Sequence, residues 1–333
     1  MKKLKPLMPW SELLHRYNAV QINVTTDDLY PDRIDEYLDA VKDLVKDTKE
    51  VLIFWAPGQI ISDAEFNNDK FDAFRKSIPN PVLFYTGCLK SGDICFFEYE
   101  SAEQWKDKDI KISISKRNKK FLSIGTKDYP QRKFVLSNII ANNLLDHGYV
   151  SYTQLGYGGL SGKYLPTEAE HINRVANVID SYLPLPSLDN SCEWVLMPST
   201  FPTDSYLNVI TDTYYEVPDN CTFLSEKVFN AMAHGQMFVM LSPAGTLRYL
   251  KSLGYQTFGE YIDESYDDIT DHYQRLLAMT NSLIKFISLP IDEIHEIYTK
   301  CFPIIMHNQN RLMNNTYWLD LCNSIDKAYR EKI

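Results

Sequence analysis

One segment of the chain, residues 212–235, carries side chains whose types and spacing suit a chemical task. A predicted strand delivers Glu216 to its carboxyl end, and Ser225 is placed to cap a helix whose first turn contains Glu226 and Lys227. Helix N-termini present N–H groups and the positive end of the helix dipole, so they suit a diphosphate. Lys227 adds a positive charge, and the Glu226 carboxylate suits the two hydroxyls of a ribose. The segment therefore predicts a site for a nucleoside diphosphate.

A loop of small residues follows the next predicted strand and belongs to the same predicted site. Its sequence is Ser-Pro-Ala-Gly-Thr, and the backbone at Gly245 and Thr246 is expected to approach the same phosphates. Glu216 is then the candidate for holding a second sugar. The alternative interpretation is a capped helix whose charged residues point into solvent. A segment of this kind, taken alone, more often has only that role.

The order of these residues resembles the donor-binding half of GT-B glycosyltransferases. The shared pattern is E-(loop)-[ST]-E-K-x-x-N-A-x-x-x-G, which runs here from Glu216 to Gly235 and is found in the α1,3-fucosyltransferase family. Phage-encoded relatives, the phage DNA-base glycosyltransferases, resemble the chain more closely. They share F-L-S-E-K and then G-T-L-x-Y-L-x-x-L-G-[FY]-x-T-F, here Gly245–Phe258, with Asp263–Asp267 after it. The resemblance covers residues 205–275.

This resemblance implies a fold and an activity. The fold would be GT-B-like, with two Rossmann-like domains whose parallel sheets face a cleft, and the reaction would move a hexose or pentose from a nucleotide-sugar to a hydroxyl. Glu226 would contact the donor ribose and Lys227 the diphosphate, with Glu216 near the donor sugar. Arg132, on the first turn of its predicted helix, stands where such relatives carry a phosphate-binding Arg. Phe223 stands where fucosyltransferases commonly carry Tyr, so we expect a UDP-linked donor.

An inverting reaction of this type needs a carboxylate base from the first domain, poised on the acceptor hydroxyl. Loops after the first-domain strands offer Asp63, Asp93 and Glu98, each of which is otherwise an ordinary surface acid. Asp63 is the predicted catalytic base because it follows a buried strand across a Pro-Gly loop. GT-B enzymes usually stabilise the leaving diphosphate with a helix dipole and basic side chains. We therefore expect no required cofactor and no obligatory metal; the seven histidines also form no H-x-x-x-H or H-E-x-x-H pair.

Basic residues are concentrated in one stretch of an otherwise acidic chain. Residues 104–133 contain ten basic and three acidic side chains, a net charge of +7, whereas the whole chain carries −10 and the remainder therefore −17. Such a patch suits an anionic ligand. Together with the phage resemblance, it predicts DNA as a partner and a hydroxymethylated pyrimidine as acceptor. Three alternatives remain: a glycan acceptor, a non-catalytic nucleotide- or DNA-binding protein on a GT-B scaffold, and a merely solvated loop rimmed by lysines.

Strand-like and helix-like runs alternate along the chain and must position these residues. Strands are predicted at residues 19–24, 51–55, 81–86, 94–97, 121–125, 150–153, 194–197, 206–215 and 237–241, and helices at 32–46, 66–77, 132–145, 168–182, 225–234, 245–253 and from 268 onward. Such alternation is typical of a mostly parallel sheet with helices on both faces. No G-x-G-x-x-G follows a strand of the first half, which argues against a dinucleotide-dependent oxidoreductase.

Composition and the alternation together predict two α/β domains. The 333 residues are 44% hydrophobic, enough for a substantial core. We expect an acceptor-side domain at 1–160, a crossover at 161–190, a donor-binding domain at 191–310 and a C-terminal helix at 311–333. No run of about 18 apolar residues occurs, so no membrane span is expected. Six scattered cysteines without a C-x-x-C pair favour a reducing compartment, the cytoplasm, or the host cytoplasm if the chain is phage-encoded.

Overall fold

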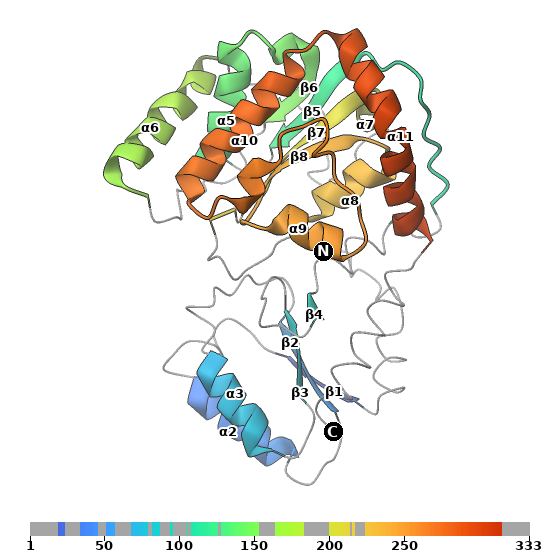
Figure 1. Ribbon diagram of the computed structural model, residues 1–333. Coiled ribbons are helices and arrows are strands. Elements are labelled where there is room, and N and C mark those ends of the chain that lie inside the picture. The colour runs from blue at the N-terminus through green and yellow to red at the C-terminus, as the bar shows by residue number, and fades with distance from the viewer. Residues whose placement is uncertain are drawn as a thin grey trace. The chain divides into compact units, whose positions relative to one another are not determined.

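The structure is a computed structural model with a mixed α/β fold (Figure 1). It describes residues 19–23, 34–45, 51–56, 68–78, 82–86, 94–95, 105, 108–125, 128–152, 164–182, 200–213, 215–216 and 224–314. The chain divides into two compact units, the first with residues 1–104, 220–222 and 315–333 and the second with residues 105–219 and 223–314. Each unit contains one four-stranded parallel sheet.

The sheet of the first unit has the strand order β1-β2-β3-β4. Its elements are β1 (Ala19–Asn23), α2 (Ile34–Val45), β2 (Val51–Ala56), α3 (Asn68–Ser77), β3 (Val82–Thr86) and β4 (Ile94–Cys95). Helix α2 buries Leu38 and Val41, and α3 buries Phe74, as the helical spacing of their apolar residues predicts. A 2.5 Å ion pair between Lys70 and Asp35 joins the two helices. The expected alternation of strand and helix is confirmed here.

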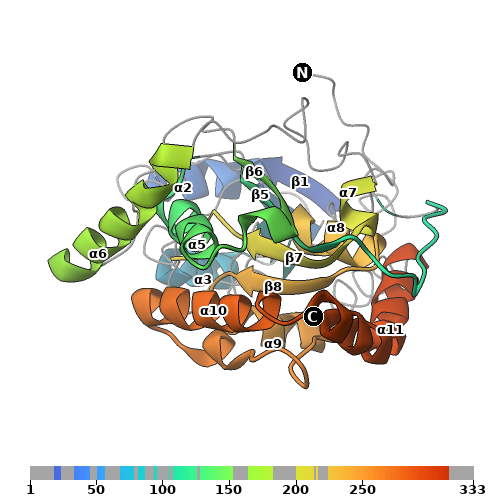
Figure 2. The ribbon, with the colours of Figure 1, turned by 90° about the horizontal axis from the view of Figure 1, so that it is seen from above.

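The sheet of the second unit has the strand order β6-β5-β7-β8 (Figure 2). Its strands are β5 (Lys119–Gly125), β6 (Gly148–Tyr152), β7 (Ser205–Thr211) and β8 (Met237–Leu241). Strand β7 includes the buried polar residues Ser205, Asn208 and Thr211, whereas β8 is a continuous, fully buried apolar run. Strands of parallel sheets read this way when helices cover both faces.

Helices cover both faces of this second sheet. They are α5 (Pro130–Ala141), α6 (Pro166–Ala176), α7 (Thr200–Thr203), α8 (Glu226–Ala233), α9 (Thr246–Ser252), α10 (His272–Ile287) and α11 (Ile291–Met313), with the short 3₁₀ turns η2 (Leu145–His147), η3 (Asn177–Tyr182) and η5 (Ser265–Asp268). Helices α5 and α10 contact each other on one face, and α8 and α11 contact each other on the other (Figure 1). Right-handed crossovers that leave neighbouring strands in opposite directions require this division.

The observed division differs from the expected boundary at residue 160. Strands β5 and β6 were expected in the first domain, but β5 pairs with β7, so residues 119–152 belong to the sheet of the second unit. The expected crossover at 161–190 contains α6 and η3, which pack against α5. The strand expected at 206–215 ends at Thr211. The strand expected at 194–197 and most of the C-terminal helix expected at 311–333 lie outside the described residues.

None of the described helices combines the length and the apolar character that crossing a membrane requires.

Candidate functional site

The order of the second sheet reverses between β5 and β7. The chain leaves β5 toward β6 on one side, and it leaves β7 toward β8 on the other. Ligands of open parallel sheets bind beyond the carboxyl ends of the strands at such a reversal. The residues that follow β5 and β7 are therefore where a site is expected.

Arg132 joins the segments that follow these two strands. It lies in the first turn of α5, whose first residue is Pro130, a residue suited to that position. Its buried guanidinium donates from Nε to the Thr211 carbonyl at 3.3 Å and from Nη2 to the Thr213 hydroxyl at 3.0 Å. Burial lowers the pKa of Arg132, whereas the negative charges of Asp212 and Glu226 act in the opposite direction. Arg132 is thus held at the end of β7.

Asp212, the first residue after β7, is completely buried. Its N–H donates to the Leu241 carbonyl at 2.9 Å, so it stays joined to the end of β8. Its Oδ1 accepts from the Ser225 hydroxyl at 2.7 Å, and its Oδ2 accepts from the Ser242 hydroxyl at 2.5 Å. Burial raises the pKa of Asp212, and the charge of Lys227 with the two serine hydrogen bonds offsets only part of that effect.

Lys227 and Glu226, in the first turn of α8, complete the cluster. The Lys227 Nζ lies 3.6 Å from Asp212 Oδ1 and 3.4 Å from Glu226 Oε1. The Lys227 side chain is 8% exposed and that of Glu226 33%, so Glu226 is the more open to solvent. Burial alone would raise the pKa of Glu226, but the charges of Lys227 and Arg132 and a hydrogen bond from its own N–H lower it overall. Glu226 is therefore ionised at neutral pH.

These four residues, which we call the β7–α8 cluster, comprise Arg132, Asp212, Glu226 and Lys227. Two cations face two carboxylates, and they come from α5, the end of β7 and the start of α8. Guanidinium and ammonium groups donate to phosphate oxygens, and carboxylates accept from hydroxyls. The cluster therefore has the chemical groups that a nucleoside diphosphate requires.

Ser225 has a role different from the expected one. It is the residue before α8 and has extended backbone angles, but its side chain makes no capping hydrogen bond to the helix. Its hydroxyl donates to Asp212 instead, because a buried carboxylate is a strong acceptor that must be satisfied. Ser225 thus fixes Asp212, and the prediction that its side chain caps α8 is wrong.

The loop at Gly245 and Thr246 is occupied by contacts within the protein. Gly245 has φ +80°, and its N–H donates to the Asp267 carbonyl at 2.7 Å. The fully buried Thr246 donates its hydroxyl to the Pro243 carbonyl. The Asp267 carboxylate accepts from the N–H groups of Leu247 and Arg248 at 2.9 and 3.1 Å. The start of α9 thus already holds an anion, and these contacts do not bring Gly245 and Thr246 into the β7–α8 cluster.

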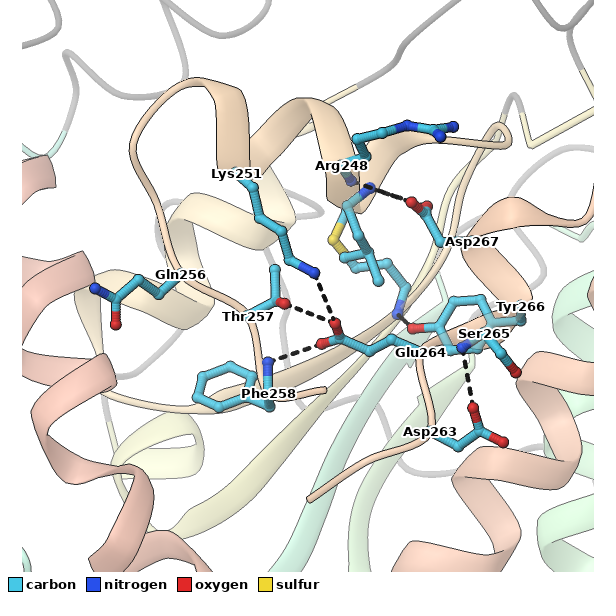
Figure 3. A network of polar contacts seen from close by, with 12 residues as sticks. Arg248, Lys251, Gln256, Thr257, Phe258, Asp263, Glu264, Ser265, Tyr266 and Asp267 are labelled. Carbon is cyan, nitrogen blue, oxygen red and sulfur yellow. Dashed lines mark hydrogen bonds and ion pairs between the residues drawn. The ribbon is translucent and has the colours of Figure 1, made fainter. Parts of the chain in front are cut away.

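The segment after Gly254 forms a second network of internal contacts (Figure 3). Glu264 lies at its centre and accepts from the Thr257 hydroxyl at 2.6 Å and the Phe258 N–H at 2.7 Å, with Lys251 Nζ at 3.4 Å. The Tyr266 hydroxyl accepts from the Met240 N–H at 3.3 Å. This network ties the loop between α9 and α10 to β8, so its acidic residues serve the fold.

Glu216 lies against the segment before α6. Its Oε1 accepts a 2.5 Å hydrogen bond from the Tyr164 hydroxyl, which also bonds to the Tyr215 hydroxyl. The neighbouring Tyr215 carbonyl accepts from Arg275 at 2.5 Å. Glu216 is thus held in place by tyrosines. The predicted base Asp63, its alternatives Asp93 and Glu98, and Phe223 all lie outside the described residues.

Most of the described basic side chains of residues 104–133 bind other groups of the protein. Arg117, Lys120 and Arg132 are buried, and Arg117 donates to four backbone carbonyls and to the Tyr298 hydroxyl. Lys133 forms ion pairs with Asp128 and Asp180, and Lys116 forms an ion pair with Asp292. In the part of this stretch that the structure describes, the exposed lysines are Lys108, Lys111 and Lys116, and the last of these is paired with Asp292.

Sequence reasoning missed Asp212, Ser242 and Arg275. Asp212 and Ser242 each directly follow a buried strand, a position that marks candidate ligands in parallel sheets. Arg275 carries no such signal. It is 1% exposed and donates to carbonyls of Tyr215 and Ser242, which lie far from it in sequence.

Within the described ranges, no group of three or more His, Cys, Asp or Glu side chains is arranged to hold a metal ion. Comparisons of the chain with protein-family models, with curated proteins and with solved structures gave no significant match. Function is therefore inferred from the chemistry of the β7–α8 cluster.

Proposed function

We propose that the protein is a nucleotide-sugar-dependent glycosyltransferase of the GT-B type, whose donor diphosphate binds at the β7–α8 cluster. The observation that carries this proposal is the convergence of Arg132 and Lys227 with two carboxylates at the carboxyl end of β7. Two units with parallel sheets are compatible with this type of enzyme. The diphosphate lies between the two cations, and the ribose hydroxyls donate to Glu226.

The two cations suit the leaving diphosphate of sugar transfer. Arg132 is 3% exposed and the Lys227 side chain is 8% exposed, so little water screens their charges. Contacts within the protein already orient both groups, and preoriented donors stabilise charge that develops in a transition state. A carboxylate base in the first unit, predicted to be Asp63, removes the proton from the acceptor hydroxyl.

The acceptor is proposed from the sequence alone: a hydroxymethylated pyrimidine in DNA, with a glycan as the alternative. A DNA acceptor gives binding that weakens steeply with salt, because cations are released from the phosphates. Transfer rates onto hydroxymethylated DNA, plain DNA and a glycan mixture, each at low and moderate salt, distinguish these acceptors. Activity on DNA that does not change with salt would contradict the DNA proposal.

A thermal-shift panel of UDP, GDP, CDP and their sugar conjugates tests the donor site. A ligand that binds only the native state stabilises it by about 2.7 kcal/mol at a hundredfold excess over its dissociation constant. We expect one nucleotide to raise the melting temperature of the wild type and of Lys251→Met, whose lysine side chain is 54% exposed on α9. Lys227→Met is expected to reduce that shift to about half, because a tenfold loss of affinity leaves only a tenfold excess of ligand. No shift with any nucleotide, or an equal shift in Lys227→Met, would contradict the proposed site.

A further inference from the structure

Asp212 joins three parts of the second unit at one point. It follows β7 directly, its Oδ1 binds Ser225 before α8, and its Oδ2 binds Ser242 after β8. Because each hydroxyl donates to a different oxygen, the carboxylate cannot turn without breaking one of these hydrogen bonds. A buried oxygen without a partner is costly, so this orientation is maintained. Oδ1 is thereby kept on the side of Lys227.

Lys227 is a side chain whose position must be fixed by its neighbours. A lysine ends in a compact charge on a flexible four-carbon stem, and ordering that stem costs rotamer entropy. Its other anionic neighbour, Glu226, has a side chain that is 33% exposed, against 8% for Lys227 itself. Without Asp212, attraction to Glu226 would draw the ammonium toward solvent and toward the position proposed for the ribose.

We propose that Asp212 is a positioning residue of the donor site: it holds the Lys227 ammonium at the carboxyl end of β7, where that charge faces the donor diphosphate. The place of the diphosphate rests on the proposed function, whereas the hold of Asp212 on Lys227 does not. The two parts can therefore fail separately. Asp212 itself is buried behind Lys227 and acts through it.

The hold on Lys227 is tested without nucleotide, by the rate at which an amine-acetylating reagent modifies Lys227, read by peptide mass spectrometry. Asp212→Asn keeps the shape of the side chain and removes its charge. We expect Lys227 to react slowly in the wild type and several-fold faster in Asp212→Asn, while Lys251 reacts at the same rate in both. Unchanged Lys227 reactivity in Asp212→Asn would overturn the proposal.

Asp204→Asn is the matched control, because Asp204 immediately precedes β7 and Asp212 immediately follows it. Asp204 accepts hydrogen bonds from Asn118 and Tyr149 at the opposite end of the strand. Its substitution is expected to leave the Lys227 rate at the wild-type value, and an equal increase would overturn the proposal. If Asp212→Asn does not fold, Ser242→Ala replaces it. That variant frees Oδ2 and is expected to raise the Lys227 rate by a smaller factor, and an unchanged rate would again overturn the proposal.

A double-mutant cycle measured by calorimetry with UDP and GDP then tests the path of the effect. Asp212→Asn and Lys227→Met are each expected to weaken nucleotide binding about tenfold, the scale of one charge-assisted hydrogen bond. Because Asp212 acts through Lys227, the double variant is expected to bind no more weakly than Lys227→Met alone. Losses that multiply would overturn the positioning role. A wild type that binds neither nucleotide refutes the proposed function, while the acetylation rates still decide whether Asp212 holds Lys227.

Discussion

The two helices that follow β7 and β8 begin in different ways, although their sequences predict the same function for both. At the start of α9, the Asp267 carboxylate accepts from two backbone N–H groups. At the start of α8, the side chain of the preceding serine does not cap the helix, the Glu226 carboxylate accepts from its own N–H, and Lys227 and Arg132 lie nearby. Both starts were expected to bind phosphate, but α9 carries its own anion.

This difference shows when the start of a helix is available to a ligand. The first N–H groups of a helix are satisfied by a side chain of the protein, by water or by a bound anion. Asp267 supplies the acceptor for the first N–H groups of α9, so the start of α9 is bound by the protein itself. The α8 end instead has two cations within reach of two carboxylates, which is an arrangement for a ligand with both phosphates and hydroxyls.

Arg275→Met is expected to damage both loops at once and to have the largest effect. Arg275 donates to carbonyls of Tyr215 after β7, Ser242 after β8, and Ile269 and Thr270 before α10. Methionine leaves these buried acceptors unpaired, so the free energy of unfolding should fall by at least ~3 kcal/mol. Urea denaturation measures the loss. Arg248→Met, with a side chain 73% exposed, is the control and should change it by less than ~0.5 kcal/mol; equal losses would contradict the role of Arg275.

Asp267→Ala separates the two helix starts. It removes the acceptor for the Leu247 and Arg248 N–H groups, so we expect a loss of about 1–2 kcal/mol of stability. Nucleotide affinity should stay within about twofold of the wild type, because independent sites affect each other little. Denaturation and calorimetry measure the two quantities. Tighter nucleotide binding by Asp267→Ala would show that a phosphate also binds the start of α9.

Gly245→Ala tests the turn that precedes α9. Gly245 has φ +80°, a conformation that costs an L-residue roughly 1 kcal/mol. An added Cβ would lie 2.8 Å from Nη2 of Arg248, but that exposed side chain can move aside. We therefore expect a loss of about 1 kcal/mol, set by backbone strain. Gly245→Asn, which introduces a residue that adopts positive φ more readily than Ala, serves as the comparison, and an equal loss in the two variants would remove strain as the cause.

The two carboxylates of the β7–α8 cluster should give opposite pH dependences of stability. Burial raises the folded-state pKa of Asp212, so its contribution is fully present below the unfolded pKa and is lost as pH rises through the folded pKa. The folded-state pKa of Glu226 is lowered overall. Its contribution to the free energy of unfolding is therefore present above the unfolded pKa and is lost as pH falls through the folded pKa. Urea denaturation of Asp212→Asn and Glu226→Gln between acidic and neutral pH measures both. Differences from the wild type that have the same sign of slope would contradict this assignment.

Local sequence patterns predicted much of the fold, including the start of α8, where the candidate site lies. Apolar runs located β2, β3, β5 and β8, and helical spacing located α2, α5 and α8. The pattern around Glu226 and Lys227 marked the start of α8. The sheet to which β5 belongs was not predictable, because pairing with β7 joins residues more than eighty positions apart. The same limit hid the cap of α9, since Asp267 lies 20 residues beyond Leu247.

The most direct test of the difference between the two helix starts is amide hydrogen exchange with and without saturating UDP or GDP, read by mass spectrometry of peptides. Peptides that cover the start of α8 at residues 224–230 and the end of β7 at residues 209–213 are expected to exchange more slowly with nucleotide. Peptides that cover residues 245–252, at α9, are expected to exchange at the same rate in both conditions. Slower exchange confined to residues 245–252, or no change in either region, would contradict a donor site at the β7–α8 cluster.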